Sequence, residues 1–300
     1  IDPQGTRTVS YLDVKDSNNI NAIPISTAGF HITDSGTNTG WTFGVDISGT
    51  VYTNEAKSAH VGAGVTMGLS VNGGAKTTVT TNSSGAFSFS ASFFNANDTI
   101  LIFVDGHASY EANFISQALN NSSAISGIEM YTNKIVLSHQ SAGPMTNALL
   151  AIADGSADDD IHYTVSGSNI DFEDGFEVWI ASGKTYTPGG TVEADDLQIE
   201  GTGTFNPAAN AVTIHGSWEH STTGTFTSTG TVTFDSTSAE TITTGGDAFY
   251  HLTFNGSGSW TLSGTDLDVD GAFTLSNGTF TAPTGTFSVA GDLVLTGGTF

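Results

Sequence analysis

The chain has 300 residues and carries 30 acidic side chains against six basic ones, a formal net charge of −24 at pH 7. Such a surface repels phosphate backbones and anionic headgroups, which argues against binding to nucleic acid or to a membrane surface. No cysteine is present, which excludes disulfides, thiolate metal sites and cysteine nucleophiles. No apolar run approaches the roughly 18 residues that a membrane-spanning helix needs.

The first segment, residues 1–44, contains TVSYLDVKDSNNINA (8–22) and DSGTNTGWTFG (34–44). It resembles segments of large secreted β-helix proteins, in which a GNNTGW-like phrase follows the last turn of the helix. GTNTGW (36–41) departs from that phrase by one residue. The resemblance predicts that 1–44 is the end of a preceding β region, and hence that the chain is part of something longer.

Residues 45–106 read as strands separated by Gly, Asn and Ser turns. Alternation in GAFSFSASF (85–93) places Phe87 and Phe89 on one face and serines on the other. The stretch resembles the carboxypeptidase-regulatory-like, transthyretin-type β-sandwich, through SGTVY (48–52) and the phrases listed next: GVTMGLSVNG, TTNSSGAFSFS and DTILIFVDG. That resemblance implies an Ig-like module that serves as a spacer or stalk and has no catalytic role.

Residues 107–124 are expected to connect this module to a second region that begins near residue 125. There GIEMYTNKIVLSH (127–139) offers two alternating strands. PMTNALLAIADG (144–155) is the one plausible short helix, ended by Gly155. SNIDFEDGFEVWIASGKTY (168–186) aligns with the repeats that follow, and we expect Trp179 and Trp260 to pack in or against that region.

One five-residue phrase recurs through residues 197–300: apolar, any, apolar, any, small turn residue. Its six copies read LQIEG, VTIHG, VTFDS, LTFNG, LDVDG and FSVAG, and they end at Gly201, Gly216, Ser236, Gly256, Gly271 and Gly291. In each copy the two apolar residues share one face of a strand. The copies thus recur at two regular intervals, one shorter and one longer, and such periods indicate stacked repeats.

These patterns predict an all-β protein: a right-handed parallel β-helix, or solenoid, over 125–300, preceded by the Ig-like β-sandwich module. Its turns are expected to take about 15 or about 20 residues. The alternative is a tandem array of antiparallel β-sandwich repeats, because strands at 8–12-residue spacing fit hairpins too. The solenoid is favoured because the turn residue keeps its register across six copies. The final LTGGTF (295–300) is the ordinary start of another repeat, so we expect the repeats to continue beyond it.

An acidic cluster lies in DGSADDD (154–160), where Asp154, Asp158, Asp159 and Asp160 are candidate Ca²⁺ ligands because hard cations take several oxygen ligands. The spacing is not that of an EF-hand, and a solvated loop is the competing interpretation. In DLDVD (266–270) the aspartates alternate with Leu267 and Val269 and are expected to face solvent.

Trp218, Glu219 and His220, in HGSWEH (215–220), form the one local combination of an aromatic ring, an acid and an imidazole. They are candidates for a sugar-stacking patch or a weak metal site, against the alternative that they are half-buried at a corner of the solenoid. No HExxH, GxSxG, P-loop or GxGxxG context occurs. Because no Lys or Arg follows Lys184, polysaccharide-lyase chemistry on the regular repeats is disfavoured.

The repeats resemble those of bacterial and archaeal adhesin-type surface proteins, which implies secretion and display on the cell surface. We therefore expect a structural or adhesive segment of a long surface protein that is not an enzyme. A carbohydrate-binding module with exposed aromatic rings is the alternative, and a carbohydrate-active enzyme with two facing carboxylates is a third. The expected partners are a polysaccharide or another surface ligand, with Ca²⁺ as a candidate cofactor and self-association through the solenoid ends.

Overall fold

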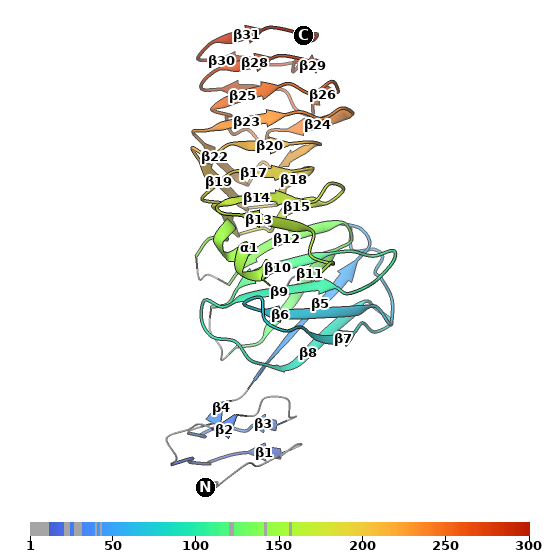
Figure 1. Ribbon diagram of the computed structural model, residues 1–300, viewed down its shortest axis with the longest axis vertical. Helices are drawn as coiled ribbons and strands as arrows, with labels where there is room; N and C mark the ends of the chain where they lie inside the picture. The colour runs from blue at the N-terminus through green and yellow to red at the C-terminus, as the bar shows by residue number, and fades with distance from the viewer. Residues whose placement is uncertain are drawn as a thin grey trace.

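The computed structural model describes residues 12–20, 25–26, 32–39, 41–42, 44–119, 123–140, 143–155 and 158–300. It is nearly all-β, with one short helix, and its turns stack along the long axis of the molecule (Figure 1). Strands of successive turns pair in parallel, so the predicted parallel β-solenoid is confirmed and the array of antiparallel hairpins is wrong. None of the described helices is long and apolar enough to cross a membrane.

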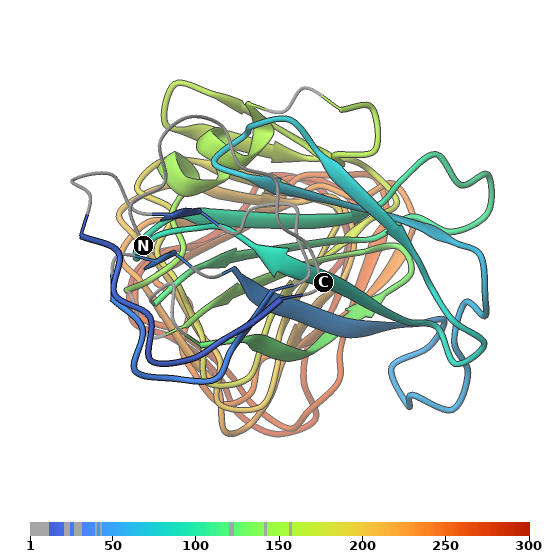
Figure 2. The ribbon, with the colours of Figure 1, turned by 90° about the horizontal axis from the view of Figure 1, so that it is seen from below.

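The solenoid has three faces. The first belongs to an eleven-stranded sheet, here called the long sheet, whose order is β29-β26-β24-β21-β18-β15-β12-β10-β9-β6-β7. Seen along the long axis, the turns superpose on one another (Figure 2). In chain order the strands of the long sheet are β6 (Thr66–Val71), β7 (Thr77–Thr80), β9 (Thr99–Val104), β10 (Asn113–Gln117), β12 (Lys134–His139), β15 (Glu177–Ile180), β18 (Asp196–Ile199), β21 (Trp218–His220), β24 (Ala239–Thr243), β26 (Ser259–Leu262) and β29 (Thr279–Thr281).

The second face is an eight-stranded sheet that starts with an antiparallel hairpin and continues with parallel strands. Its strands are β13 (Tyr163–Ser166), β14 (Asn169–Phe172), β17 (Val192–Ala194), β20 (Val212–Ile214), β23 (Thr231–Phe234), β25 (His251–Phe254), β28 (Phe273–Leu275) and β31 (Leu293–Leu295). The third face consists of two short sheets, whose strands are β16 (Thr185–Tyr186), β19 (Thr204–Ala208), β22 (Thr225–Ser228), β27 (Leu267–Val269) and β30 (Phe287–Val289).

The turn length differs from the prediction in one respect. On the second face Val212 pairs with Val232, and Val232 pairs with Leu252, so each turn there spans the longer of the two predicted intervals. The shorter interval is not a turn: LQIEG (197–201) lies on the long sheet, whereas the next copy, beginning at Val212, lies on the second face. The phrase encodes a short strand and a corner, and any of the three faces can use it.

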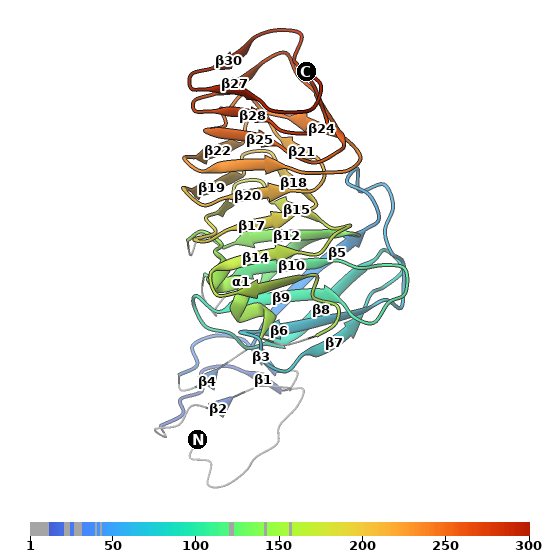
Figure 3. The same ribbon diagram turned by 45° about the horizontal axis from the view of Figure 1, so that its top comes forward.

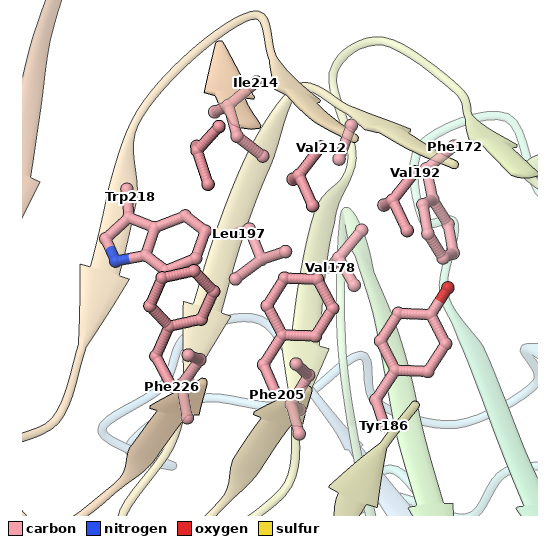
Figure 4. Packing of buried hydrophobic residues seen from close by; sticks show 14 of the residues in the cluster. Phe172, Val178, Tyr186, Val192, Leu197, Phe205, Val212, Ile214, Trp218 and Phe226 are labelled. Atoms are coloured by element: carbon pink, nitrogen blue, oxygen red, sulfur yellow. The ribbon is translucent and has the colours of Figure 1, made fainter. Parts of the chain in front are cut away.

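The interior is filled by inward side chains that stack on the equivalent residues one turn away. Tyr186, Phe205 and Phe226 form such a row on the third face, with ring centroids 5.4 and 5.9 Å apart. Figure 4 shows this row meeting the rows from the other faces, including Trp218 and Leu197, around one core. Trp260 is also buried in this core, as predicted.

The small residue that ends each five-residue phrase is explained by the close stacking of successive turns at the corners. A Cβ on Gly256 would lie 2.1 Å from the carbonyl oxygen of Ser236, one turn earlier. A Cβ on Gly291 would lie 2.7 Å from the backbone of Gly271. These corners therefore need glycine because the backbone of the preceding turn lies too close for a side chain.

A second, three-stranded sheet, here called the cover sheet, packs on the outer surface of the long sheet at its N-terminal end (Figure 3). Its order is β11-β5-β8, with β5 (Val45–Tyr52), β8 (Ala86–Ser92) and β11 (Ile125–Tyr131). The two phenylalanines of β8 are buried between the sheets and its serines are outside, as predicted. Because the long sheet passes from β9 and β10 into β12 without interruption, the sandwich and the solenoid share a sheet.

This arrangement differs from the expected order of segments in two places. The interval 107–124 contains β10, which pairs with β9 on one side and β12 on the other. β11, expected to belong to the solenoid, pairs instead with β5 of the cover sheet.

The predicted helix is α1 (Asn147–Asp154), followed by Gly155. Thr146 begins it, and the Thr146 hydroxyl accepts a hydrogen bond from the backbone N–H of Leu149 at 3.2 Å. Leu150 and Ala153 are fully buried in the solenoid core, where they pack with Leu101 of β9 and other residues of the first strands. α1 therefore covers the N-terminal end of the core, a position in which a solenoid needs an atypical element.

The first segment is also built from parallel pairs: β1 (Leu12–Val14) with β3 (Ile32–Asp34), and β2 (Ile25–Ser26) with β4 (Trp41–Thr42). The side chain of Asn38 connects the two levels, because it accepts from the N–H of Ser17 and donates to the carbonyl of Val14, each at 2.8 Å. Leu12 pairs with Ile32, the same step along the sequence that the second face of the solenoid uses between Val212 and Val232.

Candidate functional site

The predicted cluster at 218–220 does not form a surface patch. Trp218 and His220 are each 1% exposed and point into the solenoid, because β21 presents alternate residues to the core. Nδ1 of His220 lies 2.7 Å from the carbonyl oxygen of Thr244, so the imidazole holds a corner of the next turn. Only Glu219 faces solvent. Trp218 therefore cannot stack on a sugar ring, and the three residues do not converge.

The predicted acidic cluster is brought together only in part. Asp158 and Asp160 meet Asp105, which follows β9, and single oxygens of the three carboxylates lie within 4.8 Å of one another. Asp154 and Asp159 lie outside this group; Asp159 is exposed, and Asp154 accepts a hydrogen bond from the backbone of Val165.

The ammonium group of Lys76 supplies positive charge to this acidic group. Nζ of Lys76 lies 2.7 Å from Asp105 and 2.6 Å from Asp158. Hydrogen bonds to these two carboxylates raise the pKa of Lys76 well above its ordinary value. Burial opposes ionisation of Asp158, but the hydrogen bond from Lys76 lowers its pKa overall. Lys76 and Asp105 could not be found from local spacing, because they lie far earlier in the sequence than the aspartates that they join.

A groove of about 720 Å³ opens where the cover sheet ends above the long sheet. One wall is β11, and the loop at Glu55–Lys57 lies beside it. The floor is made by outward residues of β10, β12 and β15, together with Glu200, which directly follows β18. The volume lies within the range typical of small-ligand pockets. This groove, formed by segments from separate parts of the sequence, is the candidate functional site.

The rows of side chains on the groove floor follow from the pairing of residues across the strands of the long sheet. Phe114 pairs with Val136 and Val136 with Trp179, so these apolar residues form an outward row across three strands. The row turns polar at Gln198, which pairs with Trp179 one strand further along the solenoid. The change from apolar to polar marks where the cover sheet stops, since the apolar residues lie in the core between the two sheets.

The aromatic rings at the groove are already stacked on one another. Tyr131 makes a tilted contact with Tyr52 and stacks on Trp179, with ring centroids 5.8 and 5.1 Å away. Nζ of Lys134 lies 4.5 Å from the ring centroid of Trp179, and the ammonium pairs with Glu55 and Glu177. Burial, followed by the charge of Glu129, raises the pKa of Tyr131 well above its ordinary value, so this phenol stays protonated. The rings therefore stiffen the groove more than they offer open faces.

The rim combines charged residues of both signs. Lys57 pairs with Glu129 at 2.6 Å, while Lys184 and Glu200 also line the groove. His139 accepts a hydrogen bond from the backbone N–H of Thr185 through Nε2, at 2.9 Å. Burial, and then the charge of Lys184, lowers the pKa of His139, which keeps the imidazole neutral at pH 7.

One polar group faces the groove without a partner. Ser116, on β10, is 1% exposed and lines the groove, and its hydroxyl makes no hydrogen bond to any described residue. Buried hydroxyl groups are normally hydrogen-bonded, so this serine is an exception at the floor of the groove.

Aromatic rings are scarce on the described surface. Among the large hydrophobic side chains that are exposed there, only Tyr250 (38% exposed) and Phe300 (53% exposed) are aromatic. Tyr250 packs against His251, and Phe300 packs against Phe280 and Phe287. The described part of the chain therefore lacks the line of solvent-facing rings that a sugar-stacking surface requires.

Comparison with known proteins gives no guide to the role of this fold. No protein-family model matches the chain, and searches of curated proteins and of solved structures also found no match.

Proposed function

We propose that this chain is a structural segment of a secreted cell-surface protein, in which it acts as a stiff, adhesive β-solenoid rod. The observation that carries the proposal is the long sheet, whose eleven strands run from β7 in the sandwich to β29 in the solenoid. Each described turn is hydrogen-bonded to its neighbours along this sheet, so the sandwich and the solenoid have no flexible joint between them. A continuous sheet suits a protein that holds other parts at a fixed distance from a surface.

The sequence supports the cellular context of this proposal. The repeats resemble those of adhesin-type surface proteins, and the stretch 45–106 resembles transthyretin-type stalk modules. A cysteine-free chain with a net charge of −24 is suited to remaining soluble and unassociated outside the cell. We propose a non-catalytic role, since the groove at β11 is lined by stacked rings and paired charges.

Surface display can be tested in the source cells. Antibodies against the purified chain should label intact, unpermeabilised cells, and brief protease treatment of those cells should remove the signal. An antibody against a cytoplasmic protein serves as the control and should label only permeabilised cells. Labelling that requires permeabilisation would contradict the proposal.

The alternative function is carbohydrate binding, for which the groove at β11 is the candidate concave site. Its accessible hydrogen-bonding groups, including Ser182 and Glu200, favour this alternative, whereas the stacked rings do not. Depletion of the chain by a panel of insoluble polysaccharides tests it. Binding to one polysaccharide would favour a recognition module, and loss of binding with EDTA would assign a cation to the acidic loops.

A further inference from the structure

The groove is bounded by a strand with a free edge. In the cover sheet β11 pairs with β5 on one side and is the last strand on the other. An edge strand presents a row of unpaired backbone N–H and C=O groups, to which another extended chain can pair. From Ile128 to Tyr131 β11 follows β5 without irregularity, so this part of the edge is straight.

The two facing sheets differ in size, and the groove lies in the resulting step. The cover sheet has three strands and the long sheet has eleven. A strand added beside β11 would lie about 4.8 Å from it and about 10 Å above the long sheet. Ser138 of β12 and Ala181, which directly follows β15, form the groove floor next to β11. The groove thus lies at the position that a fourth strand of the cover sheet would occupy.

The groove is also built to receive such a strand. Its floor presents the half-buried side chain of Ala181, next to the buried Val136, Trp179 and Ser116. Apolar floor residues suit alternate side chains of an extended peptide, while the free edge suits its backbone. A flat sugar ring would need an open aromatic face, but Tyr131 is buried, stacked on Trp179 and in tilted contact with Tyr52.

Charge decides between the possible sources of that strand. Three glutamates line the groove against two lysines, a third lysine, Lys134, pairs with Glu55 there, and the chain as a whole carries −24. A second copy of the chain would bring its own negative charge to the site and would be repelled. A segment with net positive charge would be attracted to it.

We propose that the groove is a peptide-binding site, which takes a basic, extended segment of a partner protein as the fourth strand of the cover sheet. The segment pairs with the free edge of β11, places every second side chain on the apolar floor, and directs the intervening basic side chains toward the rim. This role goes beyond that of a passive rod, because it gives the molecule a defined attachment point at the base of the solenoid.

Selection from a displayed library of random nonapeptides would provide the probe. The folded chain serves as bait, and the variant Ala181→Phe, which fills the groove floor, serves for counter-selection. Thr241→Phe is the matched control, because Thr241 is an exposed position of β24 in the same sheet but away from the groove. We expect enriched peptides with alternating apolar and basic residues that bind the wild type and Thr241→Phe equally, and Ala181→Phe at least tenfold more weakly.

A second readout uses the wild-type chain alone, so it does not depend on the folding of a variant. Binding of an enriched peptide should slow amide hydrogen exchange in residues 125–131. N-methylation of alternate peptide residues should weaken binding at least tenfold in one register and have little effect in the other, because only one set of N–H groups faces β11. The proposal is overturned if no peptide is enriched over the counter-selection, or if N-methylation in both registers is tolerated.

Discussion

Asp105 and Asp158, from two distant segments, both pair with the ammonium group of Lys76, and Asp160 lies beside these two carboxylates. Replacing Lys76 with Met should lower the free energy of unfolding by about 1 kcal/mol, because solvent screens these partly exposed pairs. The variant should recover part of this loss when Ca²⁺ is added, since the carboxylates then need another cation. Thermal unfolding with Ca²⁺ and with EDTA measures both effects. Lys57→Met is the control and should show no Ca²⁺ response, since Lys57 pairs with the single carboxylate of Glu129.

His215 links two neighbouring turns through Nδ1, which lies 2.7 Å from Asp235. Burial disfavours the imidazolium, but the hydrogen bond to Asp235 and the nearby negative charges raise the pKa of His215 overall. A raised folded-state pKa stabilises the fold below the unfolded value of about 6.5, and this contribution is lost as pH rises through the folded value. His215→Gln should therefore cost roughly 0.5 kcal/mol at pH 5.5 and almost nothing at pH 9. Urea unfolding of both proteins at the two pH values measures the difference, and an equal cost at both would contradict the assignment.

Gly256 tests whether the corner glycines are needed for space. A Cβ at this position would meet the backbone of Asp235 and Ser236 at 2.1 to 2.2 Å, so Gly256→Ala should destabilise the protein by about 2 kcal/mol. Ser257→Ala, at the adjacent exposed residue, should change stability by less than about 0.5 kcal/mol. Denaturant unfolding of the two variants gives the comparison, and equal midpoints would show that the corner can widen freely.

At the scale of elements, α1 closes one end of the solenoid core. Removing its N-cap hydroxyl with Thr146→Ala should cost about 1 kcal/mol, and Leu150→Ala should cost about 3 kcal/mol because it leaves a cavity. Ile152→Ala, on the exposed side of the same helix, is the control and should have little effect. Denaturant unfolding compares the three variants. If Leu150→Ala were as stable as Ile152→Ala, the helix would not be sealing the core.

Several of these elements could be predicted because their signals are local. The two-residue alternation of LDVDG (267–271) places Leu267 and Val269 inside, and the apolar pattern ending at Gly155 marks the helix. The face to which each strand belongs could not be predicted, because the sequence pattern of a short strand and a corner is the same on all three faces. For this reason a step between faces, such as 197 to 212, resembled a whole turn.

The candidate groove could not be predicted from the sequence for a different reason. Its walls depend on the parallel pairing of β11 with β5, which joins distant segments, such as Met130 to Val51, and leaves no periodic pattern. Trp179 was expected to pack against the solenoid and does so, but nothing local indicates that Tyr131 stacks on it. Trp218 gave a misleading signal, since an aromatic residue beside an acid and a histidine is also what a strand with alternate buried positions produces.

At the scale of the whole molecule, the shared long sheet should make the sandwich and the solenoid unfold together. We expect a single transition in near-ultraviolet circular dichroism and in calorimetry, with coincident midpoints. Limited proteolysis should release no stable fragment cut between residues 107 and 124, because β10 lies there within the sheet. Two transitions, or a stable fragment that begins near residue 125, would show that the two parts fold independently.

The interchangeable faces also determine how the length of such a protein can change. Loss or gain of one full turn, such as the step from Val212 to Val232, returns every strand to its own face and alters the length by one strand spacing, about 4.8 Å. A change by the shorter interval of the phrase, such as the step from Gly201 to Gly216, would instead move every later strand to the wrong face and misalign the stacked rings. The length of such a solenoid can therefore change only by whole turns, so related chains can differ in length while keeping the same cross-section.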